Sequence, residues 1–108
     1  MKTIFSIEIS NKAVIEELQK QTNQIYKLLP LKEEQGDWRK LLDTITLEFV
    51  GMNGLLLGMH SYLFPLLCKL KGLSTLSGDK DFMLYRKTVF ECLTLVGEMI
   101  RECQDTIT

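Results

Sequence analysis

The stretch from Trp38 to Leu73, WRKLLDTITLEFVGMNGLLLGMHSYLFPLLCKLKGL, contains the longest apolar repeat of the chain. Alternating steps of four and three residues meet an apolar side chain at every position, and these residues form the central seam: Trp38, Leu42, Ile45, Phe49, Met52, Leu56, Met59, Leu63, Leu66, Leu70 and Leu73. A mean step of about 3.5 residues is typical of a helical face that packs against other helices. Burial of each side chain contributes roughly 1.5–3 kcal/mol before conformational entropy is subtracted. We therefore expect the remaining helices to pack around this seam.

A break is expected within the central seam. A continuous helix would be about 54 Å long, whereas a compact domain of this size has a diameter of about 34 Å. Pro65 removes a helical hydrogen bond and crowds the preceding turn, Gly58 can end a helix and Ser61 can begin one. We predict two helices, over 37–57 with Asp37 as N-cap and over 61–72. The alternative is a single kinked helix.

An amphipathic segment on each side of the central seam supplies the other helices. We predict a helix over 11–29 that ends before Pro30, and a helix over 80–105 that follows the loop 72–78. The expected inward positions of the first helix are Ile15, Leu18, Thr22, Ile25 and Leu29, flanked by Val14 and Tyr26. Those of the second are Phe82, Arg86, Val89, Leu93, Val96, Ile100 and Cys103, flanked by Tyr85, Cys92 and Met99. Short connections favour antiparallel neighbours. The sequence thus predicts an all-α antiparallel four-helix bundle, with residues 1–108 as a single helical domain.

The first ten residues have a different pattern. Phe5, Ile7 and Ile9 would share one face of an extended segment, and Ser10 or Asn11 would then cap the first helix. Because a lone strand is not stable, this segment pairs with another chain, lies over the bundle or joins the first helix. We predict a short extended N-terminal arm, and symmetric pairing of two arms would produce a dimer.

Composition and charge exclude several classes. The chain has 108 residues, is 45% hydrophobic and has a net charge of −1, whereas a protein that neutralises nucleic-acid phosphates is usually basic. No secretory signal is apparent at the start. Residues 49–68 carry no formal charge and meet the length criterion for a membrane span. Because this window includes Asn53, His60, Pro65 and three glycines, we instead expect a cytoplasmic protein without membrane association.

The residues needed for catalysis are not apparent in the sequence. His60 is the single histidine, which excludes two-histidine metal sites and the paired Glu-x-x-His motifs of di-iron bundles. A cysteine nucleophile would require a histidine nearby. The three cysteines, Cys68, Cys92 and Cys103, are better explained as reduced apolar residues of the core. We therefore expect no catalytic residue, no cofactor and no metal.

Two clusters have the residue types of protein interfaces, where aromatic and arginine side chains are enriched. They are Trp38-Arg39-Lys40 and Tyr85-Arg86-Lys87, and the candidate partner-binding residues are Trp38, Arg39, Tyr85, Arg86 and Lys87. A structural role competes with this interpretation, because Trp38 also occupies a seam position and Arg86 could pair with a carboxylate or extend to the edge of the bundle.

Two runs, YKLLPLKEEQGDW at 26–38 and FMLYRKTVFEC at 82–92, resemble small uncharacterised all-helical proteins of Gram-positive prophages and mobile elements. The resemblance implies a cytoplasmic accessory protein that contacts a host or phage protein. We expect a non-enzymatic helical protein–protein interaction module that self-associates as a homodimer, with inhibition of a host protein as a special case. The alternative is a nucleic-acid accessory protein that contacts phosphates through Lys69, Lys71, Arg86 and Lys87.

Overall fold

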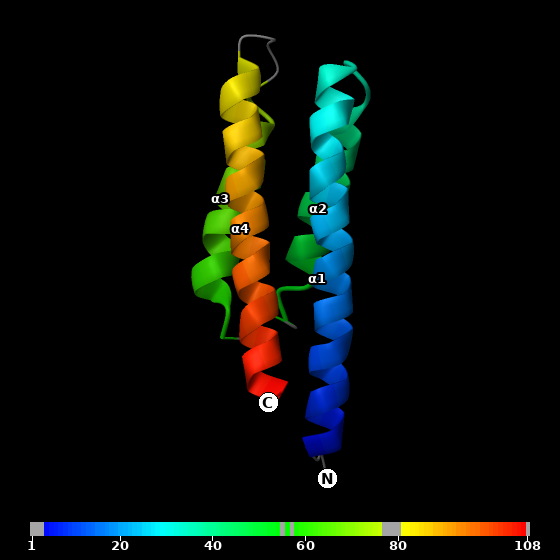
Figure 1. The fold of residues 1–108 in the computed structure, drawn as a ribbon, viewed down its shortest axis with the longest axis vertical. Helices are drawn as coiled ribbons and strands as arrows, with labels where there is room; N and C mark the ends of the chain where they lie inside the picture. Colours follow the sequence, from blue (N-terminus) through cyan, green and yellow to red (C-terminus); the bar gives the residue numbers. More distant parts are fainter. Residues whose placement is uncertain (1–3, 55, 57, 77–80, 108) are drawn as a thin grey trace.

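The computed structural model describes the backbone of residues 4–54, 56, 58–76 and 81–107, and the side chains of 12–54, 56, 58–76 and 81–105. It contains four helices: α1 (Ile4–Glu33), α2 (Trp38–Gly51), α3 (His60–Leu73) and α4 (Phe82–Ile107) (Figure 1). No strand occurs in these ranges. The predicted all-α four-helix bundle is confirmed.

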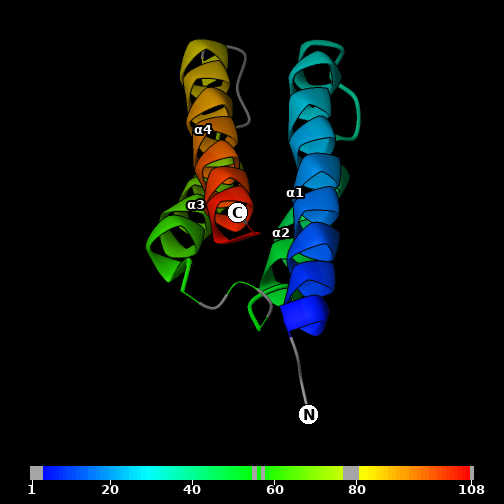
Figure 2. The same cartoon turned by 60° about the horizontal axis from the view of Figure 1, so that its bottom comes forward.

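Each helix packs against two neighbours. Helix α1 contacts α2 and α4, and α3 contacts the same two helices. The pairs α1–α2 and α3–α4 lie side by side, and the connection from α2 to α3 crosses between them (Figure 2). The C-terminal ends of α1 and α3 and the N-terminal ends of α2 and α4 meet at one end, which we call the loop end (Figure 1). The molecule is elongated, measuring 54 × 21 × 19 Å.

The central seam is the core of this bundle. All eleven of its side chains are buried, and the most exposed, Met59 and Trp38, retain only 9% and 7% of their accessible surface. They pack with the inward faces of α1 and α4 in one continuous cluster. The prediction from the sequence repeat is therefore confirmed at every position.

The helix along the seam is broken as predicted, and the alternative of a single kinked helix is wrong. Helix α2 ends at Gly51, earlier than the expected residue 57, and α3 begins at His60. Gly58 has φ +86°, a left-handed conformation that favours glycine. Between the helices, Leu56 N donates to Met52 O at 3.1 Å and Met59 N donates to Leu56 O at 3.1 Å. These turns keep the apolar residues of the seam inside although the helix has stopped.

Helix α1 is longer than predicted. The backbone is helical from Ile4, so the extended N-terminal arm is wrong, and Ser10 and Asn11 lie inside the helix instead of capping it. Pro30 does not end α1, which continues to Glu33. A proline near the end of a helix costs one hydrogen bond, and the packed inward face of α1 outweighs this loss because helix stability in proteins comes mainly from tertiary packing.

The inward faces of α1 and α4 are rotated from the predicted ones. The buried side chains of α1 are Val14, Leu18, Gln21, Ile25, Leu28 and Lys32, and those of α4 are Tyr85, Val89, Cys92, Val96, Met99 and Cys103. The expected positions Ile15, Thr22, Leu29, Phe82, Leu93 and Ile100 are only half-buried, and Arg86 is exposed. The predicted face of α1 had Thr22 as its polar residue, whereas the observed face includes Gln21 and Lys32.

Two smaller expectations have different outcomes. Asp37 caps α2 as predicted, because its carboxylate accepts a hydrogen bond from Lys40 N at 3.3 Å. Cys92 and Cys103 are buried as expected, but Cys68 is exposed, so its assignment to the core is wrong. Cys68 lies on the outer side of α3, two residues after the buried Leu66.

Candidate functional site

The five candidate residues fall into two groups. Trp38 and Tyr85 are buried at the loop end, with Arg39 beside them, whereas Arg86 and Lys87 are exposed on α4. The structure thus joins the aromatic members of the two sequence clusters and separates them from the cations that follow Tyr85.

An aromatic and cationic cluster closes the core at the loop end. The rings of Trp38 and Tyr85 meet edge to face, 5.2 Å apart and inclined by 83°. The ammonium of Lys32 lies 4.9 Å from the Trp38 centroid and 5.2 Å from that of Tyr85, and the Arg39 guanidinium lies 4.7 Å from Trp38. Arg39 also donates to the carbonyl of Ser74 at 2.8 Å, which links α2 to the end of α3. We call Lys32, Trp38, Arg39 and Tyr85 the Lys32 cluster.

Two polar groups in the Lys32 cluster are buried without conventional partners. Lys32 is 8% exposed, and no carboxylate in the described part of the chain forms an ion pair with it. The Tyr85 hydroxyl is fully buried and finds no hydrogen-bond acceptor or donor among the same residues. Burial raises the pKa of Tyr85 far above its ordinary value, so the phenol stays neutral. Most buried polar groups in proteins are paired, which makes this cluster unusual.

Sequence reasoning missed Lys32 because the first helix was predicted to end at residue 29, which placed Lys32 in the turn after it, whereas α1 continues to Glu33. A signal was nevertheless present. Lys32 follows Leu28 by four residues, and Leu28 follows Ile25 by three, so Lys32 continues the repeat that buries α1. The lysine was recognisable only after the correct inward face of α1 had been chosen.

The second group belongs to an apolar and cationic surface on α4. Met83, Leu84, Arg86, Lys87, Phe90, Glu91 and Thr94 line a shallow hollow on its outer side. Tyr26 of α1 meets Phe90 edge to face at 6.4 Å, and the Arg86 guanidinium lies 5.0 Å from the Phe90 centroid. We call this surface, together with Tyr26, the Phe90 face. Arg86 and Lys87 were predicted at a binding surface, whereas the contribution of Tyr26 requires the packing of α1 against α4.

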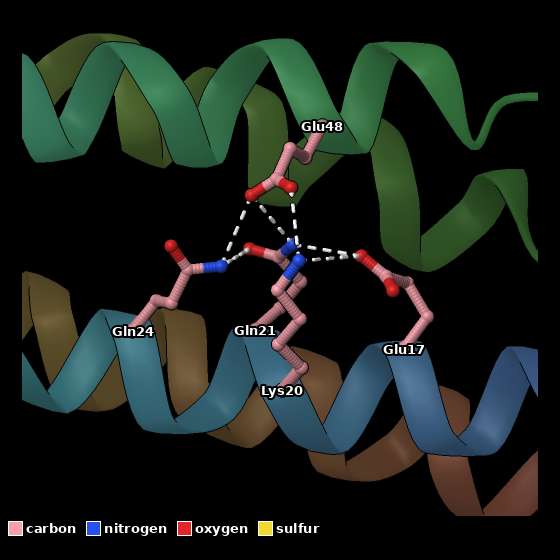
Figure 3. A network of polar contacts seen from close by, with 5 residues as sticks. All are labelled: Glu17, Lys20, Gln21, Gln24 and Glu48. Carbon is pink, nitrogen blue, oxygen red and sulfur yellow. Dashed lines mark hydrogen bonds and ion pairs between the residues drawn. The ribbon is translucent and has the colours of Figure 1, made fainter.

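A polar network joins α1 to α2 (Figure 3). Gln21, which is fully buried, donates to Glu17 Oε1 at 3.2 Å and to Glu48 Oε1 at 3.0 Å. Gln24 donates to the same Glu48 oxygen at 3.0 Å, and Lys20 Nζ lies 3.3 Å from Glu48 Oε2. Hydrogen bonds from Gln21, then from Gln24 and Lys20, hold the pKa of Glu48 below its ordinary value. The Glu48 network thus links one carboxylate of α2 to three side chains of α1, and we expect it to contribute to the register of the two helices.

His60 and Cys92 have structural contacts of their own. His60 shares a hydrogen bond of 2.9 Å with Asn53 Oδ1 and stacks on Phe64 at 5.1 Å. Burial raises the pKa of the Cys92 thiol to about 12, which keeps it protonated and unreactive. Within the described ranges, no group of three or more His, Cys, Asp or Glu side chains could hold a metal ion.

Comparisons with protein-family models, curated proteins and solved structures found no match. Among the helices described, none is both long and apolar enough to cross a membrane. Two features stand out by their geometry, namely the exposed Phe90 face and the buried Lys32 cluster.

Proposed function

We propose that this protein is a non-enzymatic helical interaction module that self-associates through the Phe90 face. The observation that carries the proposal is the exposure of large apolar side chains on the outer side of a helix whose inner side already fills the core. Tyr26, Met83, Leu84 and Phe90 retain 50%, 74%, 53% and 38% of their accessible surface. Contiguous apolar surface rimmed by charges is typical of protein interaction sites.

The spacing of the Phe90 face suits a second helix. Met83, Lys87, Phe90 and Thr94 repeat in steps of four, three and four and are all exposed. They form a stripe on α4 opposite the buried one, which begins at Tyr85. A helix with a heptad stripe on each side can pack on its own bundle and on another helix at the same time.

Charge complementarity favours a second copy of this chain. Glu91 accepts a hydrogen bond from Lys69 of α3 at 3.2 Å, so Glu91 and Lys87, one turn earlier, lie on the side of the stripe that faces α3. When two identical helices pack antiparallel about a twofold axis, equivalent sides face each other. Lys87 of one copy then lies opposite Glu91 of the second copy, and the pairing occurs twice.

The resemblance to prophage and mobile-element proteins supports a wider proposal. We infer a cytoplasmic accessory protein of a phage or mobile element, with inhibition of a host protein as the special case in which the same face binds a foreign partner. No contact among the described residues favours the nucleic-acid alternative: Lys69 is paired with Glu91, and Arg86 lies over Phe90.

Light scattering coupled to size exclusion tests the proposal directly. We expect the wild type to have twice the 12.5 kDa chain mass, and Met83→Glu to be monomeric, because a charge placed at a buried apolar contact removes at least about tenfold in affinity. Leu47→Glu is the matched control: Leu47 is 70% exposed, but on α2. A wild type that is monomeric at every concentration contradicts the proposal, as does equal dissociation of both variants.

A charge exchange then tests the antiparallel pairing. Lys87→Glu places like charges opposite each other and is expected to weaken the dimer, whereas Lys87→Glu combined with Glu91→Lys reverses both charges and restores it. Both variants are made in a Lys69→Met background, because Lys69 pairs with Glu91 within one chain and would repel a lysine at position 91. Circular dichroism of each variant verifies that the bundle remains folded. If the double variant is no more dimeric than the single one, the two helices pair in a different orientation.

A further inference from the structure

The single glycine of α4, Gly97, has no evident role within its own chain. A glycine inside a helix is destabilising relative to alanine, because it loses more backbone freedom on folding. Gly97 neither ends the helix, which continues to Ile107, nor has a positive φ. It is exposed, and a Cβ added there would meet no atom of the described residues within 4 Å, apart from the nearby backbone of α4 itself. Neither a turn nor a close contact within the chain therefore explains this glycine.

Gly97 continues the exposed stripe of α4. The stripe advances in steps of four, three and four residues, and a further step of three leads to Gly97; its members are Met83, Lys87, Phe90 and Thr94. Gly97 therefore lies on the side of α4 that would face a second helix. A glycine at such a position lets another group approach the helix backbone closely.

The antiparallel pairing brings one particular side chain to Gly97. In that pairing, Lys87 of one copy lies opposite Glu91 of the second copy. Met83, four residues before Lys87, therefore lies opposite Leu95, four residues after the glutamate. Side chains on a helix lean toward the N-terminus of their own helix. In an antiparallel pair this direction runs toward the C-terminus of the other helix, so Met83 leans from Leu95 toward Gly97.

The side chain of Met83 suits this position. It is 74% exposed, more than any other large apolar side chain that the structure describes, so its own chain covers little of it. Methionine is unbranched and adapts its shape to an irregular space. The open space over Gly97 can hold such a side chain, and each copy offers one Met83 and one Gly97.

We propose that Gly97 receives Met83 of the second copy, and that this contact makes the Phe90 face specific for an antiparallel copy of the same helix. The inference rests on the self-association proposed above and names the residue pair that selects the partner. The contact occurs twice about the twofold axis, on either side of the central pairs between Lys87 and Glu91. In a parallel dimer identical residues face each other, so Met83 would meet Met83 and the space at Gly97 would stay unfilled.

Substitution of Gly97 tests the contact, with the dimer Kd of the full-length protein measured by sedimentation equilibrium. Gly97→Leu fills the space that Met83 occupies, and we expect the Kd to rise at least about tenfold. The urea midpoint, measured below the Kd, should be no lower than that of the wild type, because leucine favours a helix more than glycine does. Gly51→Leu is the matched control, since Gly51 is an exposed helical glycine of α2, and its Kd should equal that of the wild type.

A double-mutant cycle shows whether the contact joins two chains. Met83→Ala alone should weaken the dimer, but in the Gly97→Leu background it makes room for the leucine. We expect the double variant to dimerise at least about threefold more tightly than the two single effects predict. The two positions are 14 residues apart, about 21 Å along one helix, which is too far for direct coupling within a chain. In a parallel dimer the same distance separates them, and the two effects would add.

The outcomes separate this inference from the proposed function. A wild type that is monomeric at every concentration contradicts self-association, and the contact falls with it. A dimeric wild type whose Kd is unchanged by Gly97→Leu, or additive effects at positions 83 and 97, contradicts the contact alone. Circular dichroism verifies that each variant is folded. If Gly97→Leu does not fold, Gly97→Ala takes its place: a Kd raised about threefold supports the contact, and an unchanged Kd refutes it.

Discussion

The Glu48 network permits a quantitative test of how α1 and α2 are held in register. The change is Glu48→Leu, which removes the carboxylate that accepts hydrogen bonds from Gln21 and Gln24 and pairs with Lys20. A hydrogen bond to a charged group contributes about 1.5–3 kcal/mol when buried. Because the Glu48 side chain is 30% exposed and the Lys20 side chain 56%, solvent screening reduces the total for the network to about 1.5 kcal/mol.

Urea unfolding followed by far-ultraviolet circular dichroism measures this loss. With an m-value of about 1.5 kcal/mol/M, a loss of about 1.5 kcal/mol lowers the midpoint by about 1 M. The m-value itself should not change, because the network adds little to the surface that unfolding exposes. Lys12→Leu is the control, since Lys12 is an exposed residue of α1 outside the Glu48 network.

A double-mutant cycle separates the network from the apolar gain of leucine. We expect Gln21→Leu to restore much of the stability in the Glu48→Leu background, because it removes a buried amide that has lost one acceptor. The coupling energy between the two positions should be about 1 kcal/mol. If Glu48→Leu leaves the midpoint unchanged, or if the coupling is below about 0.3 kcal/mol, the network does not contribute to register and this reasoning is refuted.

Three further predictions concern pH, the helix break and the cysteines. The pKa of Glu48 is lowered in the folded state, so the ionised carboxylate adds to the free energy of unfolding above the ordinary pKa of 4.5, and this stabilisation is lost as pH falls through the folded pKa. Urea midpoints measured from neutral to acidic pH should therefore decline less in Glu48→Gln than in the wild type. Gly58→Ala should lower the free energy of unfolding by about 1 kcal/mol, because an alanine is strained at the Gly58 φ of +86°. Gly54→Ala is the control, because an added Cβ there would have no neighbouring atom within 4 Å, and it should lower the thermal midpoint far less than Gly58→Ala does. Equal shifts of the thermal midpoint would contradict the left-handed conformation of Gly58. Iodoacetamide should alkylate the exposed Cys68 in the native protein and leave the buried Cys92 unmodified until denaturant is added. Mass spectrometry measures the modification of each cysteine. Rapid modification of Cys92 in the native protein would contradict the packing of α4.

Part of the fold was predictable for a simple reason. The central seam repeats every three or four residues over its whole length, so its helical form and its buried side depend on local spacing alone. A break before α3 was likewise predictable, because Gly58 tolerates the left-handed backbone found there, but the prediction placed the end of α2 at residue 57 and the helix ends at Gly51. The length argument for that break was wrong, however: the molecule extends over 54 Å because α1 alone has 30 residues.

The candidate site was only partly predictable. Trp38, Tyr85, Arg86 and Lys87 were selected by residue type, but sequence could not show that the first two are buried together and that the last two lie on an outer face. Tyr26 joins the Phe90 face only because α1 packs against α4. Residues distant in sequence meet through helix packing, which no local pattern encodes.

What the sequence determined by itself is the helical bundle and the apolar seam at its centre, because side-chain periodicity translates directly into a buried helix face. Only the tertiary structure decided which sides of α1 and α4 turn inward. A fully buried Gln21 and a nearly buried Lys32 occupy that face because Glu48 and two aromatic rings from other helices compensate them. The free energy of burying a polar side chain depends on its partners, and partners exist only after the chain has folded.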